Sequence, residues 1–406
     1  MRAEKTFHRF DKFNTKYNPI GQPLLREIFL KQNNHIRGKF LAQLTRQVFD
    51  DLENNKYQFA EYRISIYGRQ TNEWETLAAW VVDNELWSKN VRWMIQVPRL
   101  FKLWRKLGKV KTFQEMLDNI FRPLFQASVD PGSYPRLAVF LEQVIAFDSV
   151  DDESQRERGY FAGMPLADEW DEIENPPYSM WSYYMYANIA VLNKLRFSKG
   201  MNTFTYRPHA GEAGDIEHLA ATFLTANSIN HGILLYHSPA LQYLYYLAQI
   251  GISISPLSNN LLFCKYEDNP FPRFFRRGLN VTLSTDDPLM IHVTKEPLVE
   301  EYSVAAQVWK LTSTDLCEIA RNSVLQSGFH PKFKAYWVGQ HYCENGPNSN
   351  DVARTNVPDI RVMYRWELLR EELAYINHAK ENLQKQIRID LEGKFSLAAS
   401  HNEEKK

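Results

Sequence analysis

Residues 203–212, TFTYRPHAGE, decide the fold prediction because a β-rich run ends in a group of reactive side chains. The first half, TFTYR, has the β-branched and aromatic composition typical of a strand. The second half, PHAGE, contains proline and glycine, which mark the end of a regular element. Residues 214–226 then show the apolar spacing of a helix. The stretch therefore predicts a strand, a turn that carries His209 and Glu212, and a helix.

The same alternation recurs along the chain. The strand candidates are residues 62–67 (YRISIY), 92–97 (RWMIQV), 144–148 (VIAFD), 203–207 (TFTYR), 230–234 (NHGIL), 252–255 (ISIS) and 281–285 (VTLST). Helical patterns lie at residues 182–195, 214–226, 239–249 and 298–310, after Thr71, and after Thr112, which precedes Glu115 by three residues as in a capping box. Strand–helix alternation of this kind indicates parallel strands joined by right-handed crossovers.

The strand count predicts an α/β fold, a TIM-type (β/α)8 barrel missing strand 1, with additional helices. Eight strands close such a barrel, whereas the chain offers seven candidates, and residues 24–53 look helical rather than β. We therefore expect the chain to start just after the first barrel strand. The predicted domains are residues 1–376, an incomplete barrel, and residues 377–406, a charged C-terminal helix or tail.

Composition predicts a soluble globular protein. Hydrophobic residues make up 44% and charged residues 24% of the 406 residues, which are usual values. Lys plus Arg and Asp plus Glu number 48 each, so no overall positive charge points to nucleic acid or to an anionic membrane. We find no secretory signal and expect no membrane span, because polar residues interrupt every apolar stretch. The three scattered cysteines favour a reducing, cytosolic location.

Reactive side chains collect at the C-terminal ends of the last four strand candidates, the second of which itself carries His231 and Gly232. In chain order they are PHAGE at 208–212, HG at 231–232, PLSNN at 256–260 and DDP at 286–288. Because barrel enzymes build their sites at the C-terminal ends of the strands, these clusters are predicted to form one pocket.

The side chains in these clusters suit metal-assisted hydrolysis. His209 and Asp286 offer the nitrogen and oxygen ligands that Zn²⁺ accepts in catalytic sites. Glu212 is placed to shuttle a proton, and His231 to orient or deprotonate a water. Asp287 would accept a hydrogen bond from a substrate.

Each cluster alone also has an ordinary structural explanation. A single histidine near a strand end is more often a hydrogen-bonded polar residue than a metal ligand, and Asp-Asp-Pro is a common turn signal. The functional interpretation is favoured because the clusters follow consecutive strands. By contrast, the acidic runs at residues 151–153 and 300–301 are predicted to be solvent-exposed charge, with a role in subunit contacts or in the fold as the alternative.

The clusters resemble the motifs of the adenosine/AMP deaminase family of zinc-dependent barrels: HAGE at 209–212, HG at 231–232 and STDDP at 284–288. The resemblance is closer to the AMP deaminases. Blocks that look like theirs are KFNTKYNP at 12–19, FDSVDDES at 147–154, YYMYANI at 183–189, SPLSNN at 255–260, LSTDDP at 283–288 and TKEPLVEEY at 294–302. Several long blocks in the right order make this resemblance specific.

The resemblance implies hydrolytic deamination of AMP to IMP and ammonia in purine nucleotide metabolism, with one Zn²⁺ per subunit. It implies that His209 and Asp286 are zinc ligands, that Glu212 protonates adenine N1 and that His231 is the general base. The substrate-binding residues implied in the same way are Lys12, Phe13, Asn14, Thr15, Lys16, Tyr17, Glu212, Asp287, Pro288, Leu289 and Met290. AMP is the expected small-molecule partner, and a homo-oligomer is expected.

One family feature is absent from the sequence. The family's other two zinc ligands form a His-x-His pair on the first barrel strand, whereas no two of the 11 histidines here are separated by a single residue. We therefore expect little catalysis by this chain alone. Two alternatives stay open: a catalytically inactive short isoform or structural partner of full-length subunits, and an adenosine deaminase, against which the KFNTKYNP block argues.

Overall fold

The computed structural model describes residues 17–155, 159 and 161–403, with residues 382–403 described by their backbone alone. Within these residues the strands form two parallel four-stranded sheets, ordered β1-β2-β3-β4 and β5-β6-β7-β8. Their bounds are β1 Ala60–Ser65, β2 Val91–Pro98, β3 Val144–Val150, β4 Thr205–Tyr206, β5 His209–Ala210, β6 Ser228–His231, β7 Gly251–Ile254 and β8 Val281–Leu283. The α/β class and the parallel pairing predicted from the sequence are confirmed.

All seven predicted strand runs overlap strands of the structure, and β5 is an addition. The interruption between β4 and β5 falls at Arg207 and Pro208, where proline has no N–H to donate. The chain still bonds on both sides of this break: the Arg207 N–H donates to the Phe147 carbonyl at 2.8 Å, and the Pro208 carbonyl accepts from the Asn230 N–H at 2.9 Å. The break thus joins the first sheet to the second.

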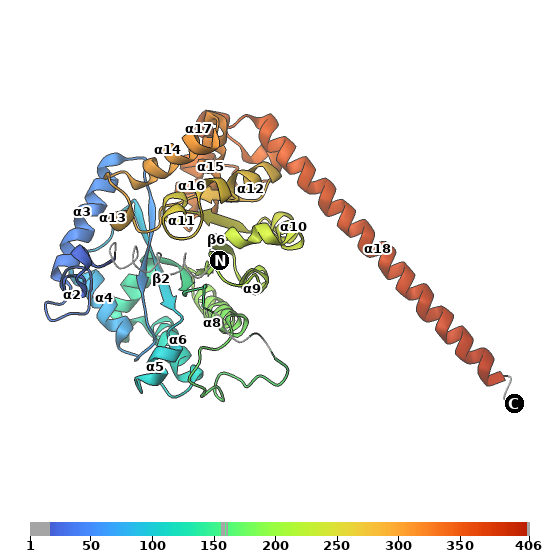
Figure 1. The fold of residues 1–406 in the computed structure, drawn as a ribbon, viewed down its shortest axis with the longest axis horizontal. Helices are drawn as coiled ribbons and strands as arrows, with labels where there is room; N and C mark the ends of the chain where they lie inside the picture. The colour runs from blue at the N-terminus through green and yellow to red at the C-terminus, as the bar shows by residue number, and fades with distance from the viewer. Residues whose placement is uncertain (1–16, 156–158, 160, 404–406) are drawn as a thin grey trace.

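Helices connect the strands and surround them (Figure 1). The longer ones before β5 are α3 Lys39–Asn55, α4 Glu73–Asp83, α6 Phe113–Val129, α7 Pro135–Gln143 and α8 Tyr178–Ser198, with shorter α2 Pro23–Phe29 and α5 Phe101–Lys106. Those after β5 are α9 Glu217–Thr225, α10 Pro239–Ala248, α11 Pro256–Leu262, α12 Phe271–Arg277, α13 Pro288–Ile291, α14 Pro297–Trp309, α15 Ser313–Gln326, α16 Pro331–Val338, α17 Val352–Thr355 and α18 Asp359–Glu403. The N-cap half of the predicted capping box of α6 is confirmed, because the Thr112 side chain accepts from the Glu115 N–H. The Glu115 carboxylate accepts from the Lys111 N–H.

Two apolar cores hold the sheets against these helices. The first packs β2 and β3 against α4, α6 and α8 around fully buried Trp74, Phe113 and Trp181. The second packs β6 to β8 against α10, α12 and α14, with Phe271 stacked on Trp309 at 4.9 Å between ring centroids. Burial of large aromatic side chains contributes most of the apolar area that stabilises such layers.

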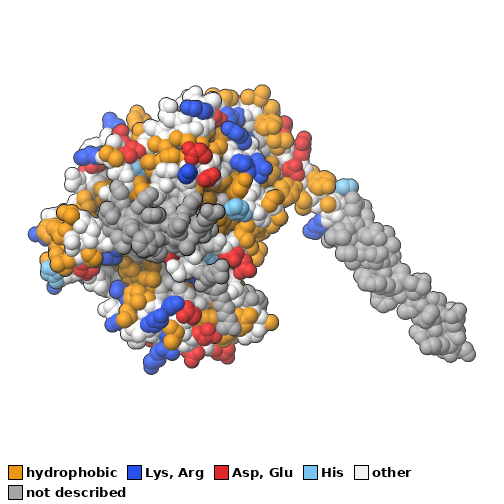
Figure 2. Space-filling view, in the orientation of Figure 1, with side chains coloured by type: hydrophobic (Ala, Val, Ile, Leu, Met, Phe, Trp, Pro, Cys, Tyr) orange, Lys and Arg blue, Asp and Glu red, His pale blue; other side chains and the backbone are white. Residues whose placement is uncertain are grey.

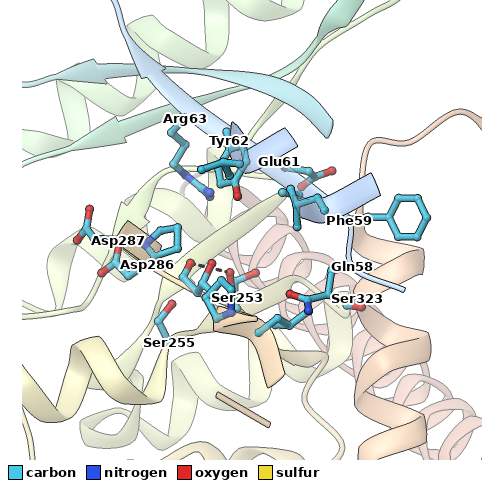
Figure 3. Close-up of a pocket in the computed structure, with 18 of the residues that line it drawn as sticks. Gln58, Phe59, Glu61, Tyr62, Arg63, Ser253, Ser255, Asp286, Asp287 and Ser323 are labelled. Carbon is cyan, nitrogen blue, oxygen red and sulfur yellow. Dashed lines mark hydrogen bonds between the residues drawn. The ribbon is translucent and has the colours of Figure 1, made fainter. Parts of the chain in front are cut away.

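The outer edges of β1 and β8 have no strand partner among the described residues. Every residue of β1 is half-buried, whereas β8 is fully buried. A pocket of about 1530 Å³ lies between these edges and is lined from both sides, including Tyr62 and Arg63 of β1 and Thr282 of β8. Figure 3 shows Arg63 and Tyr62 across the pocket from Asp286 and Ser253. The pocket between the edges of β1 and β8 is therefore the candidate location for a functional site.

Helix α18 projects far from the body (Figure 1). Its first turns are tied to α15, where Glu318 accepts from Arg361 at 2.6 Å and from Arg365 at 3.0 Å. The helix continues without a break past residue 376, so the predicted domain boundary there stays a prediction. No helix in the described part of the chain combines the length and apolar character needed to cross a bilayer. Basic and acidic side chains lie interspersed on the face shown in Figure 2.

Candidate active site

The pairing of β5 with β6 brings the two predicted histidines together. His209 pairs with Asn230, and Ala210 pairs with His231 in parallel register. The imidazole centroids of His209 and His231 lie 5.0 Å apart. One ligand atom from each of His209, His231 and Asp286 falls within 4.8 Å of the others. Side chains from β5, from the end of β6 and from the segment after β8 therefore form a single group, as the sequence predicts.

His209 is oriented by a buried carboxylate. Asp148, at the end of β3 and fully buried, accepts from His209 Nδ1 at 2.9 Å and from the His209 N–H at 3.1 Å. Arg63 donates to the other Asp148 oxygen at 2.8 Å and to Asn230 Oδ1 at 2.8 Å. A hydrogen bond at Nδ1 leaves Nε2 of the His209 ring as its ligand atom, which is how a carboxylate orients a metal-binding histidine.

His231 lies on a strained backbone. Its φ of +70° is rare for a residue with a side chain, and Gly232 follows with φ +59°. In this conformation the His231 ring lies beside His209 and Asp286. Its Nδ1 is 3.1 Å from Asn259 Nδ2 and 3.4 Å from Glu212 Oε1. The Asn259 side chain comes from α11, the helix that follows β7. Glu212 and His231, predicted as proton-transfer residues, are thus neighbours.

The two consecutive aspartates after β8 have different partners. Asp286 Oδ2 accepts from the Ser258 hydroxyl at 2.6 Å, which fixes the carboxylate toward the histidines. Asp287 accepts from the Tyr17 hydroxyl. Tyr17 is the one residue of the 12–17 block within the described residues, and its contact puts the end of that block at the site. Lys12, Phe13, Asn14, Thr15 and Lys16 lie outside the described residues.

The residues predicted to line the purine site do line the pocket: Asp287, Pro288, Leu289 and Met290. They form the start of α13, a short helix directly after β8. Leu289 is 58% exposed, as a side chain available for contact would be.

Burial and neighbouring charges set the protonation of the site. Burial lowers the pKa of His209, but the charge of Asp148 and its hydrogen bond outweigh this and leave the pKa raised. Burial and then the charge of His209 lower the pKa of His231 to about 4. Burial raises the pKa of Asp287 to about 6. Opposite shifts in adjacent titratable groups are typical of functional sites.

Sequence reasoning missed several residues that build the site. Asp148 and Arg63 belong to predicted strands but were not singled out. The prediction of exposed charge is wrong for Glu153 and Glu301, which are 4% and 0% exposed. Glu301 accepts from His292 Nε2 at 2.9 Å and from the Leu257 N–H at 3.0 Å, and burial raises its pKa. The one sequence signal for their burial was that Glu153 and Glu301 lie in the family blocks at 147–154 and 294–302. A local run of acidic residues does not reveal tertiary partners.

Comparison with known proteins gives one consistent result. The sequence profile of the AMP deaminase family matches residues 1–382. Similar proteins are an AMP deaminase of Arabidopsis thaliana, 63% identical over 93% of this chain and 45% of its own, and one of Saccharomyces cerevisiae, 57% identical over 93% and 47%. Human AMP deaminase 3 is 52% identical over 94% of this chain and 50% of its own. The chain thus spans about half the length of the curated relatives it matches.

Among solved structures, the chain is similar to an arabidopsis N6-mAMP deaminase. That structure gives a TM-score of 0.49 with 12% sequence identity, over 77% of this chain and 79% of its own.

Proposed function

Because this chain belongs to the AMP deaminase family, we propose that its site takes part in the hydrolytic deamination of AMP, in which AMP and water give IMP and ammonia. The observation that carries the proposal is the close group of His209, His231 and Asp286 with Glu212 beside it. Two nitrogens and an oxygen within 4.8 Å, next to a carboxyl group, are the parts that hydrolysis of an amidine requires.

The donor set fits Zn²⁺. His209 and Asp286 would hold the ion. Asp148 orients the His209 ring and Ser258 orients the Asp286 carboxylate, as hydrogen-bonding neighbours of metal ligands commonly do. When bound, Zn²⁺ lowers the pKa of a coordinated water to about 7. His231, at the same group, is placed to act as a general base or to add a further ligand.

The remaining roles follow from position. Glu212 would protonate adenine N1 from its place beside His231, and Asp287 would hold the purine. The Tyr17 contact to Asp287 supports a role in nucleotide binding for Tyr17, the described end of the 12–17 block. Addition of the water oxygen to C6 needs a proton on N1, which Glu212 would give, and loss of a proton from the water, which His231 would take. Return of that proton from His231 to the amino group would let ammonia leave as the C6–N bond breaks.

The finer fold proposal is a (β/α)8 barrel in which a further strand lies between β1 and β8. Their edges, which have no strand partner in the described part of the chain, flank the pocket. The family resemblance implies that this strand would carry the His-x-His pair. We use "the extended form" for this chain joined, upstream of Met1, to a family strand that carries the pair. A cytosolic location, a homo-oligomer and the 1–376 domain boundary are proposed with it.

The chain as it stands is expected to bind zinc weakly and to produce little or no IMP. Two family ligands leave most of the coordination shell to water, whereas zinc sites normally use three or four protein ligands. Zinc content after dialysis and IMP formation from AMP measure both properties. Near-stoichiometric zinc with measurable IMP would show that other residues, His231 first among them, replace the missing pair.

A second candidate function has one observation in its favour. Without a His-x-His pair in the sequence, the chain would serve as a catalytically inactive partner of full-length subunits. Co-purification with a full-length AMP deaminase, together with an inactive extended form, would favour that role over the enzymatic one. Activity of the extended form on adenosine equal to that on AMP would instead favour an adenosine deaminase.

A further inference from the structure

The turn that carries His209 and Glu212 is held by side chains to which the proposed reaction gives no role. Glu153, in the loop after β3, accepts from the Gly211 N–H at 2.7 Å through Oε2 and from the Glu212 N–H at 3.4 Å through Oε1. On the other side, the Tyr178 hydroxyl donates to the His209 carbonyl at 2.8 Å. Three backbone groups of this short turn thus form hydrogen bonds with side chains from two other parts of the chain.

His218 joins these two supports. Its Nδ1 lies 3.1 Å from Glu153 Oε2, and its ring stacks on Tyr178 with 3.9 Å between centroids and 12° between planes. Glu153, His218 and Tyr178 are each at most 4% exposed. A buried carboxylate is costly unless it accepts several hydrogen bonds, and here it accepts from two backbone donors and faces the imidazole.

The backbone around Glu153 also packs closely against the turn. Gly214 has φ +78°, and a Cβ added there would lie 1.6 Å from the Glu153 carbonyl oxygen. Gly211 has φ +71°, and a Cβ there would lie 2.8 Å from the Leu219 side chain. Both positions therefore require glycine, and the loop of Glu153 and the turn of Glu212 fit together in one arrangement.

We propose that Glu153 is a positioning residue for Glu212. Its carboxylate fixes the backbone N–H groups of Gly211 and Glu212, and so sets the place from which the Glu212 carboxyl reaches His231. A carboxylate suits this task better than an amide. Both carboxylate oxygens accept hydrogen bonds, whereas the NH2 group of an amide is a donor and cannot accept from a backbone N–H. Groups that act in a reaction need their geometry fixed by such supporting contacts. The use of Glu212 in catalysis rests on the proposed function, whereas the hold on its backbone does not.

The first test measures hydrogen exchange at the Gly211 and Glu212 amides in the chain as it stands. Loss of a charge-assisted hydrogen bond should speed exchange at these amides by roughly ten- to a hundredfold in Glu153→Ala. Glu153→Gln, which keeps one acceptor and the shape, should show a smaller rise. Glu169→Ala removes an exposed carboxylate as the matched control and should leave both amides unchanged. Unchanged exchange in both Glu153 variants would overturn the proposal.

The second test separates positioning from general support, using the extended form. Glu153→Gln should lower kcat for AMP by about tenfold or more while KM and the thermal midpoint stay near the parent values. A fall in kcat that is accompanied by a clearly lowered thermal midpoint would mean that Glu153 only supports the fold, which contradicts a positioning role. If the parent extended form makes no IMP, the proposed function fails, and the exchange experiment still decides the hold of Glu153 on the turn.

Discussion

Glu212→Gln in the extended form is expected to lower the rate of AMP deamination by about 10²–10⁴-fold, the usual contribution of a general acid or base. Glutamine has nearly the same shape and stays polar, but its amide has no acidic proton to give to adenine N1. AMP binding should therefore persist while turnover is lost. The Glu212 side chain is only 12% exposed, and its Oε1 lies 3.4 Å from His231 Nδ1.

Steady-state kinetics with AMP, together with AMP affinity measured by calorimetry, provide the check. Glu169→Gln makes the same chemical change at an exposed position and should leave both parameters at the parent values. A Glu212→Gln enzyme with more than about half of the parent turnover would rule out the assigned role, because a lost proton donor costs far more than twofold.

Lys12→Ala and Lys16→Ala are expected to raise KM for AMP in the extended form by about ten- to a hundredfold, the value of one charge-assisted hydrogen bond. The AMP phosphate needs cationic partners, and both lysines belong to the block that resembles the nucleotide-binding segment of the family. Both residues lie outside the described part of the chain. The described end of their block, Tyr17, hydrogen-bonds to Asp287 at the site.

Adenosine is the control substrate for this experiment, because it lacks the phosphate and should show nearly unchanged kinetics in both variants. A site that discriminates by polar contacts is left with unpaired groups when the phosphate is missing, which is why the effect should be specific to AMP. Lys194→Ala, at an exposed position on α8, controls for a general loss of positive charge. Equal losses for AMP and adenosine would mean that the block supports the fold and does not bind the phosphate.

Local sequence patterns predicted the strands well, because β-rich runs and turn residues alternate clearly along this chain. The break at Pro208 shows the limit. The predicted run at 203–207 contains all of β4, and β5 starts two residues after the run because proline cannot donate within a ladder. The juxtaposition of His209, His231 and Asp286 was predictable from strand order, because parallel strands gather their C-terminal ends at one edge.

The supporting residues could not be found in the same way. Glu153 and Glu301 lie in acidic runs that are typical of solvent-exposed loops, and partners outside these runs explain their burial. Glu153 accepts from residues 211 and 212, and Glu301 from residues 257 and 292. Such partners leave no periodic signal in the sequence.

Zinc-dependent formation of IMP from AMP by the extended form tests the proposed function most directly. We expect one zinc per chain after dialysis and release of one ammonia for each IMP. His209→Ala and Asp286→Ala should each lose both activity and zinc, since these two side chains are the proposed ligands. The proposed function would be contradicted if both variants folded and bound zinc as tightly as the parent extended form. It would also be contradicted if the zinc-bound parent formed no IMP.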